Sequence, residues 1–92
     1  METYDDMYFI SLLFAYGADF HNKIENLDGK VEFSFAECKV NVYVLDEGQP
    51  TEMKDLIIPE IYTHYQRRKL LYPPNFPDGR RRFLELLHAK KC

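Results

Sequence analysis

The chain has 92 residues, a mass of 11.0 kDa and a net charge of −3, so it is long enough for one small domain with a modest core. Its seven Tyr and seven Phe argue against intrinsic disorder, because disordered chains lack the large side chains that offset the entropy of ordering. The longest near-continuous apolar run, Met7–Tyr16, spans about 15 Å as a helix, half of a bilayer core, which argues against a transmembrane segment.

The first predicted element is a helix over about residues 4–25. Thr3 can cap it, and Asp6 stands three residues later in the capping-box position. Gly17 lowers helix stability by about 1 kcal/mol relative to alanine, so it marks a kink, a break or a close crossing. The helical stripe recurs at spacings of three and four residues and comprises Phe9, Leu13, Tyr16, Phe20 and Ile24.

A β-hairpin is predicted after the turn at residues 26–29, because two runs alternate apolar and polar side chains. A tight turn at Ala36-Glu37 would place all the apolar residues on one face. One long strand with a bulge at Ala36-Glu37 explains the same alternation. The edges of the hairpin need a third partner, either residues 53–58 or another chain. The predicted pairs are Phe35 with Cys38, Phe33 with Val40, and Val31 with Val42.

Two helices are predicted in the C-terminal third. Pro59 suits the first position of a helix over about 59–71, with Ile58, Ile61, Tyr62 and Tyr65 along one side. Residues 73–79 form a stiff proline-containing loop, and Asp78 can cap a last helix over about 79–90. The inward side chains of that helix are expected to be Phe83, Leu84 and Leu87.

The predicted fold class is therefore α+β: an N-terminal helix, an antiparallel β-hairpin with a candidate third edge strand, and two C-terminal helices on one face of the sheet. We expect a single compact domain over 1–92. Its helix-hairpin part, 1–58, is acidic, and its helical part, 59–92, is basic.

Catalytic and metal-binding patterns are lacking in the sequence. The three histidines, His21, His64 and His88, fall on three different predicted helices, without the spacing of a helical zinc site. There is no Gly-rich phosphate loop and no Gly-x-Ser-x-Gly elbow. Cys38 is expected on the buried face of a strand, where a thiolate is disfavoured. The sequence therefore predicts a protein without enzymatic activity, metal or cofactor.

A cytoplasmic location is predicted from the cysteines and the N-terminus. Cys38 and Cys92 can form at most one disulfide, whereas disulfide-stapled secreted domains of this size carry more cysteines. The first residues are acidic, whereas signal and transit peptides begin with basic residues.

Charge is divided unevenly along the chain. Residues 1–60 carry four Lys/Arg against thirteen Asp/Glu, a net charge of −9, whereas residues 61–92 carry eight against two, a net charge of +6. Cations and aromatic residues alternate in the basic part, as they do on nucleic-acid-binding surfaces. A hairpin of the last two helices would gather them into one patch. The candidate binding residues are Tyr62, Tyr65, Arg67, Arg68, Lys69, Tyr72, Phe76, Arg80, Arg81 and Arg82, with Lys90 and Lys91 beyond them.

Three other interpretations of this segment remain open. Tyr62 and Tyr65 are spaced as core residues, and Phe76 can plug the loop onto the sheet. The cations can also neutralise acidic residues of the same or a neighbouring chain. Consecutive cations on a helix point about 100° apart, so a triplet does not face one ligand, and these cations can simply be solvated.

The leading functional hypothesis is a small binding protein that docks on a protein or nucleoprotein complex, as an inhibitor or accessory factor acting by steric occlusion. Small acidic proteins of this type are common among phage-encoded inhibitors. The alternative is a module that binds RNA or DNA directly, although its pI of 5.5 lies below the values usual for such modules. A homodimer through a free strand edge is a third expectation, and no membrane partner is expected.

Overall fold

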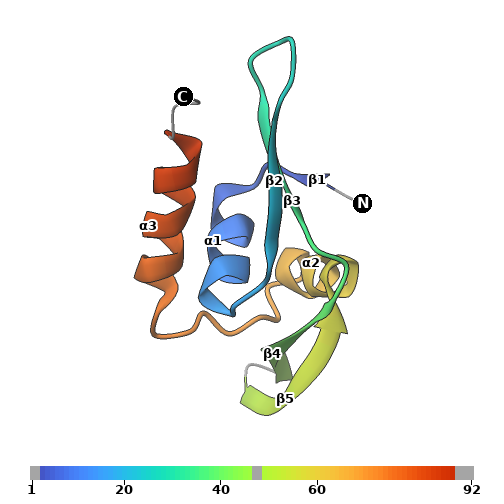
Figure 1. Ribbon diagram of the computed structural model, residues 1–92. Helices are drawn as coiled ribbons and strands as arrows, with labels where there is room; N and C mark the ends of the chain where they lie inside the picture. The colour runs from blue at the N-terminus through green and yellow to red at the C-terminus, as the bar shows by residue number, and fades with distance from the viewer. Residues whose placement is uncertain (1–2, 47–48, 89–92) are drawn as a thin grey trace.

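The computed structural model describes residues 3–46 and 49–88, with the backbone alone for residues 46 and 49–52. It confirms the α+β class. In chain order the elements are β1 (Thr3–Tyr4), α1 (Met7–Ala15), β2 (Phe20–Glu25), β3 (Val31–Phe35), β4 (Lys39–Asp46), β5 (Gln49–Ile57), α2 (Ile58–Gln66) and α3 (Phe76–Leu87) (Figure 1).

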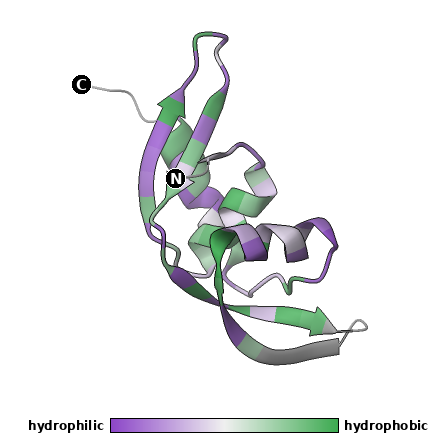
Figure 2. Cartoon of the chain, turned by 90° about the vertical axis from the view of Figure 1, so that its right-hand side faces the viewer, coloured by the Kyte–Doolittle hydropathy of each residue, from purple (hydrophilic) through white to green (hydrophobic). Residues whose placement is uncertain are grey.

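The strands form two antiparallel sheets instead of the single sheet expected. One has the order β1-β3-β2 and the other pairs β4 with β5. The predicted hairpin is therefore wrong, because β3 pairs with β2 and β1 while β4 pairs with β5. The alternative of one long strand with a bulge at Ala36-Glu37 is not found either, because residues 36–38 separate β3 from β4 and the two strands belong to different sheets. In Figure 2 the strands follow one curved side of the molecule, and the helices lie inside the curve.

Turn chemistry explains the change of partners. A two-residue hairpin turn needs positive φ angles, and among the described non-glycine residues only Arg68 has one. Gly29 supplies a φ of 84° in the turn between β2 and β3, and its backbone N–H donates to the Asn26 carbonyl over 2.9 Å. Residues 49–57 become the partner of β4, so the expected strand at 53–58 exists with a different neighbour. A homodimer through a free edge stays a prediction.

The predicted N-terminal helix over 4–25 is wrong beyond Ala15. Gly17 has a φ of 87° and ends α1, so it is the break that the sequence allowed as one of three roles. Phe20–Glu25 is a strand, which also places His21 on a strand instead of a helix. The N-cap is Asp6, whose side chain accepts from the Tyr8 and Phe9 amides, whereas Thr3 lies in β1.

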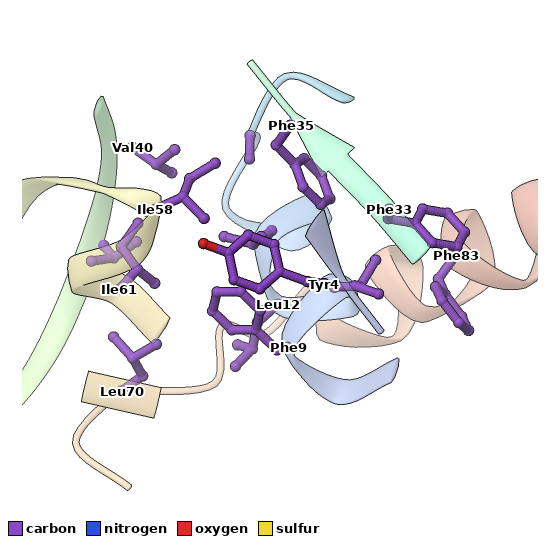
Figure 3. Close-up of a cluster of buried hydrophobic side chains, with 14 of the residues drawn as sticks. Tyr4, Phe9, Leu12, Phe33, Phe35, Val40, Ile58, Ile61, Leu70 and Phe83 are labelled. Atoms are coloured by element: carbon purple, nitrogen blue, oxygen red, sulfur yellow. The ribbon is translucent and has the colours of Figure 1, made fainter. Parts of the chain in front are cut away.

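The core lies between α1 and the strands, and α1 and α3 pack closely. Phe9, Leu12 and Leu13 of α1 are fully buried, and Phe33 of β3 contacts Phe83 of α3 with ring centroids 5.1 Å apart (Figure 3). A Cβ placed on Gly79 of α3 would lie 2.2 Å from the Ser11 carbonyl oxygen of α1, so the two helix backbones are nearly in contact there.

The C-terminal helices begin and end differently from the prediction. Helix α2 begins at Ile58 with Pro59 in its first turn, as expected, but it ends at Gln66 instead of residue 71. Helix α3 spans Phe76–Leu87 instead of 79–90, and its N-cap position is Asn75 instead of Asp78. The predicted hairpin of these helices is wrong, because α3 packs against α1 while α2 contacts β4 and β5.

Candidate binding surface

The predicted cations lie at two places on the helical side of the molecule. Arg67, Arg68 and Lys69 follow the end of α2, and residues 80–82 lie in the first half of α3. All six side chains are exposed, and none forms an ion pair with another residue of the described part of the chain. Acidic residues, by contrast, are exposed on the strands and their turns, for example Glu25, Asp28 and Asp55.

Tyr62 and Tyr65 belong mainly to the packing of α2 on α1. Their ring centroids lie 4.8 and 5.2 Å from that of Phe9, and both side chains are partly buried. The Tyr65 hydroxyl donates to the Asp6 carboxylate, with both oxygens 3.0 Å away. Asp6 therefore caps α1 and holds α2 at the same time. Sequence reasoning placed Asp6 only within a capping box and missed its contact with Tyr65.

Because of the Tyr65 hydroxyl, the free energy of unfolding should decrease at alkaline pH. Burial, and next the Asp6 carboxylate, raise the pKa of Tyr65 above its ordinary value. A group whose pKa is raised in the folded state stabilises fully below its unfolded pKa, here about 10, and loses that contribution as the pH rises further. At pH 8 we expect Tyr65→Phe to unfold about 1 kcal/mol more easily than the wild type, through loss of one hydrogen bond.

The difference in unfolding free energy between the wild type and Tyr65→Phe should shrink as the pH rises from 10 to 11. At these pH values the Tyr65 phenol ionises in the unfolded wild type, which favours unfolding, and the variant has no such group. Urea titrations at pH 8, 10 and 11 measure this difference, with Tyr43→Phe on β4, whose side chain is exposed, as the control. A gap between wild type and Tyr65→Phe that is constant over these pH values would contradict the role of the hydroxyl.

Two hollows are lined by the remaining candidates, and one ring contact joins them. The first, of about 390 Å³, is lined by Tyr65, Gln66, Arg68, Leu70 and Tyr72. The second, of about 600 Å³, is lined by Phe76, Pro77, Arg80, Arg81, Leu84 and Glu85. The Tyr72 and Phe76 rings pack together, with centroids 4.9 Å apart. We call Arg68, Tyr72, Phe76, Arg80 and Arg81 the arginine–aromatic surface.

The other predicted residues do not join this surface. Arg67 and Lys69 are exposed but line neither hollow. Arg82 borders a different hollow, beside Asp19 and Asp78. Lys90 and Lys91 lie outside the described residues.

Leu84 is the residue that sequence reasoning placed incorrectly. It was expected to face inward, but it is 36% exposed and lines the second hollow. A helix that begins at Phe76 instead of 79 puts Phe76, Arg80 and Leu84 on one face at spacings of four residues. The start of the helix was therefore the signal that could have identified this face.

The described part of the chain contains neither a metal site nor a membrane-spanning helix, and its cysteine does not lie in the expected position. Residues 3–46 and 49–88 hold no group of three or more His, Cys, Asp or Glu side chains arranged to bind a metal ion. No helix within them has the length and apolar character needed to cross a membrane. Cys38 lies in the bend after β3, partly exposed beside a cavity of about 340 Å³, and not on the buried face of a strand as expected. Cys92 lies outside the described residues.

Comparison with protein families, curated proteins and solved structures finds no match to this chain. Its function therefore has to be inferred from the geometry of the arginine–aromatic surface and the charges around it.

Proposed function

We propose that this chain is a non-enzymatic binding protein that docks on a protein or nucleoprotein complex through the outer face of α3. The observation that supports this is the second hollow. Arg80 and Arg81 stand without ion pairs among the described residues, beside an apolar surface made by Phe76 and Leu84. Aromatic residues and arginine are enriched at the centres of protein interfaces, where they contribute most of the binding energy.

The expected partner surface is acidic with an apolar centre. A guanidinium pairs with a carboxylate through two parallel hydrogen bonds, so Arg80 and Arg81 favour a partner that presents Asp or Glu beside an aliphatic side chain. Leu84 and Phe76 then lose water on docking, which adds the apolar contribution. Docking would act by steric occlusion, as an inhibitor or an accessory factor.

The distribution of charge would orient the encounter. The strands and turns carry exposed acidic residues and a few lysines, while the arginines lie on α3 and after α2. A molecule with two such sides is steered toward an acidic surface with its helices first. We place this activity in the cytoplasm, in keeping with the low cysteine content.

Direct binding of RNA or DNA is the second candidate, and the six exposed cations, which form no ion pair with a described residue, favour it. The acidic strands and the pI of 5.5 oppose it. Several phosphate contacts would make the affinity for a mixed oligonucleotide fall steeply between about 50 and 200 mM salt. Failure to bind such an oligonucleotide even at low salt would exclude this candidate.

Charge reversal on α3 tests the leading proposal. We expect R80E/R81E to weaken capture of the partner from a lysate of the source cells by about 10–100-fold, because two desolvated charges would meet like charges. K39E/K54E changes the net charge equally on β4 and β5 and should capture the partner like the wild type. Quantitative pull-down with and without nuclease is the measurement.

The outcomes separate the two candidates. Capture that survives nuclease and is lost only in R80E/R81E supports docking on a protein. Capture abolished by nuclease identifies a nucleic acid or a nucleoprotein complex as the partner, and the oligonucleotide titration then distinguishes these two. Equal capture by both double variants would overturn the proposal for the α3 face.

A further inference from the structure

The end of α2 holds an arginine in a backbone conformation that suits glycine. The Arg68 amide donates to the Tyr65 carbonyl over 3.0 Å, and the Lys69 amide donates to the His64 carbonyl over 2.8 Å. These two bonds make a Schellman motif, in which Arg68 occupies the left-handed position with a φ of 58°. Glycine is usual there because an L side chain crowds the following carbonyl. Strained residues of this kind cluster at ligand sites.

Hydrogen bonds on the C-terminal side hold this arginine in place. The Leu45 amide of β4 donates to the Lys69 carbonyl over 2.6 Å, and the Leu71 amide donates to the Tyr43 carbonyl over 3.1 Å. Together with the Schellman motif, they fix the backbone on both sides of Arg68. The backbone that carries the Arg68 side chain is therefore preorganised, which lowers the backbone entropy lost on binding a ligand.

The hollow beside Arg68 combines three kinds of group. Tyr65 and Tyr72 supply aromatic rings, Gln66 supplies an amide, and Arg68 supplies a guanidinium that forms no ion pair with any described residue. Tyr72 is 48% exposed, so part of its ring is open to a ligand. Leu70 is buried and adds apolar lining. The volume of about 390 Å³ falls within the range of small-molecule sites.

The Asp6 carboxylate lies near the hollow and accepts hydrogen bonds from the Tyr65 hydroxyl and from the Tyr8 and Phe9 amides at the positive end of α1. These bonds stabilise its negative charge without removing it, since burial, and next the Asp6 carboxylate, raise the pKa of both tyrosines that line the hollow. Among the lining residues Arg68 is the cation, so an anionic ligand would bind at its guanidinium. The hydrogen bond to Asp6 holds Tyr65, so its ring is a fixed wall.

We propose that this hollow binds a nucleotide unit, an aromatic base that carries a phosphate. The base stacks on the exposed ring of Tyr72, and the phosphate pairs with the guanidinium of Arg68, which forms two parallel hydrogen bonds to phosphate oxygens. Gln66 can donate to and accept from the edge of the base. The hollow shares no lining residue with the docking face on α3, although the Tyr72 and Phe76 rings are in contact, and either site can bind its ligand without the other. The unit can be a free mononucleotide or part of a single-stranded nucleic acid.

Arg68→Gly tests the site through two opposite effects. We expect its Tm to rise by about 2–6 °C, because the relief of the left-handed conformation outweighs the larger backbone entropy that glycine loses on folding. Its affinity for adenosine 5′-monophosphate should fall at least about tenfold, because the phosphate loses its partner. Arg67→Gly is the matched control, because it removes the same charge one residue earlier, where φ is −86°. It should leave the affinity for the nucleotide unchanged and should not raise the Tm.

NMR titration of the full chain with four probes completes the design. Adenosine 5′-monophosphate should bind more tightly than inorganic phosphate or adenosine, and Tyr72→Ala should weaken it at least about fivefold. A single-stranded ten-nucleotide RNA that binds much more tightly than the mononucleotide identifies nucleic acid as the source, and equal affinities identify the free nucleotide. R80E/R81E should bind the mononucleotide like the wild type, which separates this site from the docking face.

Three results would overturn the site. One is the absence of mononucleotide binding by the wild type. Another is an affinity that Arg68→Gly leaves unchanged. The third is inorganic phosphate binding as tightly as the nucleotide, which would leave the rings without a role.

Discussion

Replacement of Gly79 by alanine is expected to lower the free energy of unfolding by about 3 kcal/mol and the Tm by about 15 °C. The added Cβ would lie 2.2 Å from the Ser11 carbonyl oxygen and 2.9 Å from the Ala15 amide nitrogen. Both are backbone atoms of α1, so the two helices must move apart. Helix propensity alone predicts the opposite sign, because alanine stabilises a helix interior by about 1 kcal/mol relative to glycine.

Urea unfolding monitored by circular dichroism measures this change, and Gly29→Ala is its control. Gly29 has a φ of 84° but nothing within 4 Å of an added Cβ, so only its backbone conformation opposes alanine. That conformation accounts for about 1–2 kcal/mol. The Gly79 variant should therefore be the less stable of the two. A Gly79 variant at least as stable as the wild type would show that α1 and α3 do not cross as described.

The same contact positions the docking face. Gly79 lies between Phe76 and Arg80, so the side of α3 that touches α1 fixes which side chains point outward. Asn75 adds to this arrangement, because its side-chain amide donates to the Ala15 carbonyl at the end of α1 over 2.8 Å. The close approach of α3 to α1 at Gly79 therefore determines which side chains of α3 lie on its outer face.

Local signals allowed the sequence to predict α2 well. Pro59 has a fixed φ that suits the first turn of a helix, and Ile58 and Ile61 are buried on the side that their spacing indicated. The end of α2 was missed because Arg68, and not a glycine, takes the left-handed position. Sequence signals for a helix end depend on glycine, so this end was not visible in the sequence.

Residues 20–25 were misassigned because their spacing fits two structures. Phe20 and Ile24 are four residues apart, a separation that a helix and a strand both tolerate. The positive φ of Gly17 and the pairing of Phe20–Glu25 with β3 settle the choice. Strand partners involve residues far apart in the sequence, so alternation alone predicted that strands exist but not which ones pair.

The candidate surface was predicted in part. The alternation of cations and aromatic residues pointed to Arg68 and Tyr72, which line the first hollow, and to Phe76, which lines the second. The same alternation included Arg67 and Lys69, which line neither hollow. Successive residues at a helix end point in different directions, so membership of the surface depends on the helix ends, which sequence predicts least well.

Phe33→Ala is expected to be the most destabilising substitution, with a loss of about 4 kcal/mol of unfolding free energy. Phe33 is 1% exposed, and its ring lies 5.1 Å from that of Phe83, 5.7 Å from Phe20 and 6.5 Å from Phe14. It therefore joins β3 to β2, α1 and α3, and its removal leaves a cavity among all four. Phe33→Leu keeps most of the volume and should lose about half as much, as measured by urea unfolding.

A double-mutant cycle then distinguishes the observed packing from the hairpin expected from alternation. In the structure Phe33 contacts Phe83, and Figure 3 places Val40 on the opposite side of the cluster. We expect F33L and F83L to be coupled by about 0.5–1.5 kcal/mol, the range for an aromatic pair. F33L and V40A should be additive within about 0.5 kcal/mol, because distant sites act independently. Stronger coupling of Phe33 to Val40 than to Phe83 would mean that β3 pairs with β4 after all, and that Phe83 of α3 does not pack on β3.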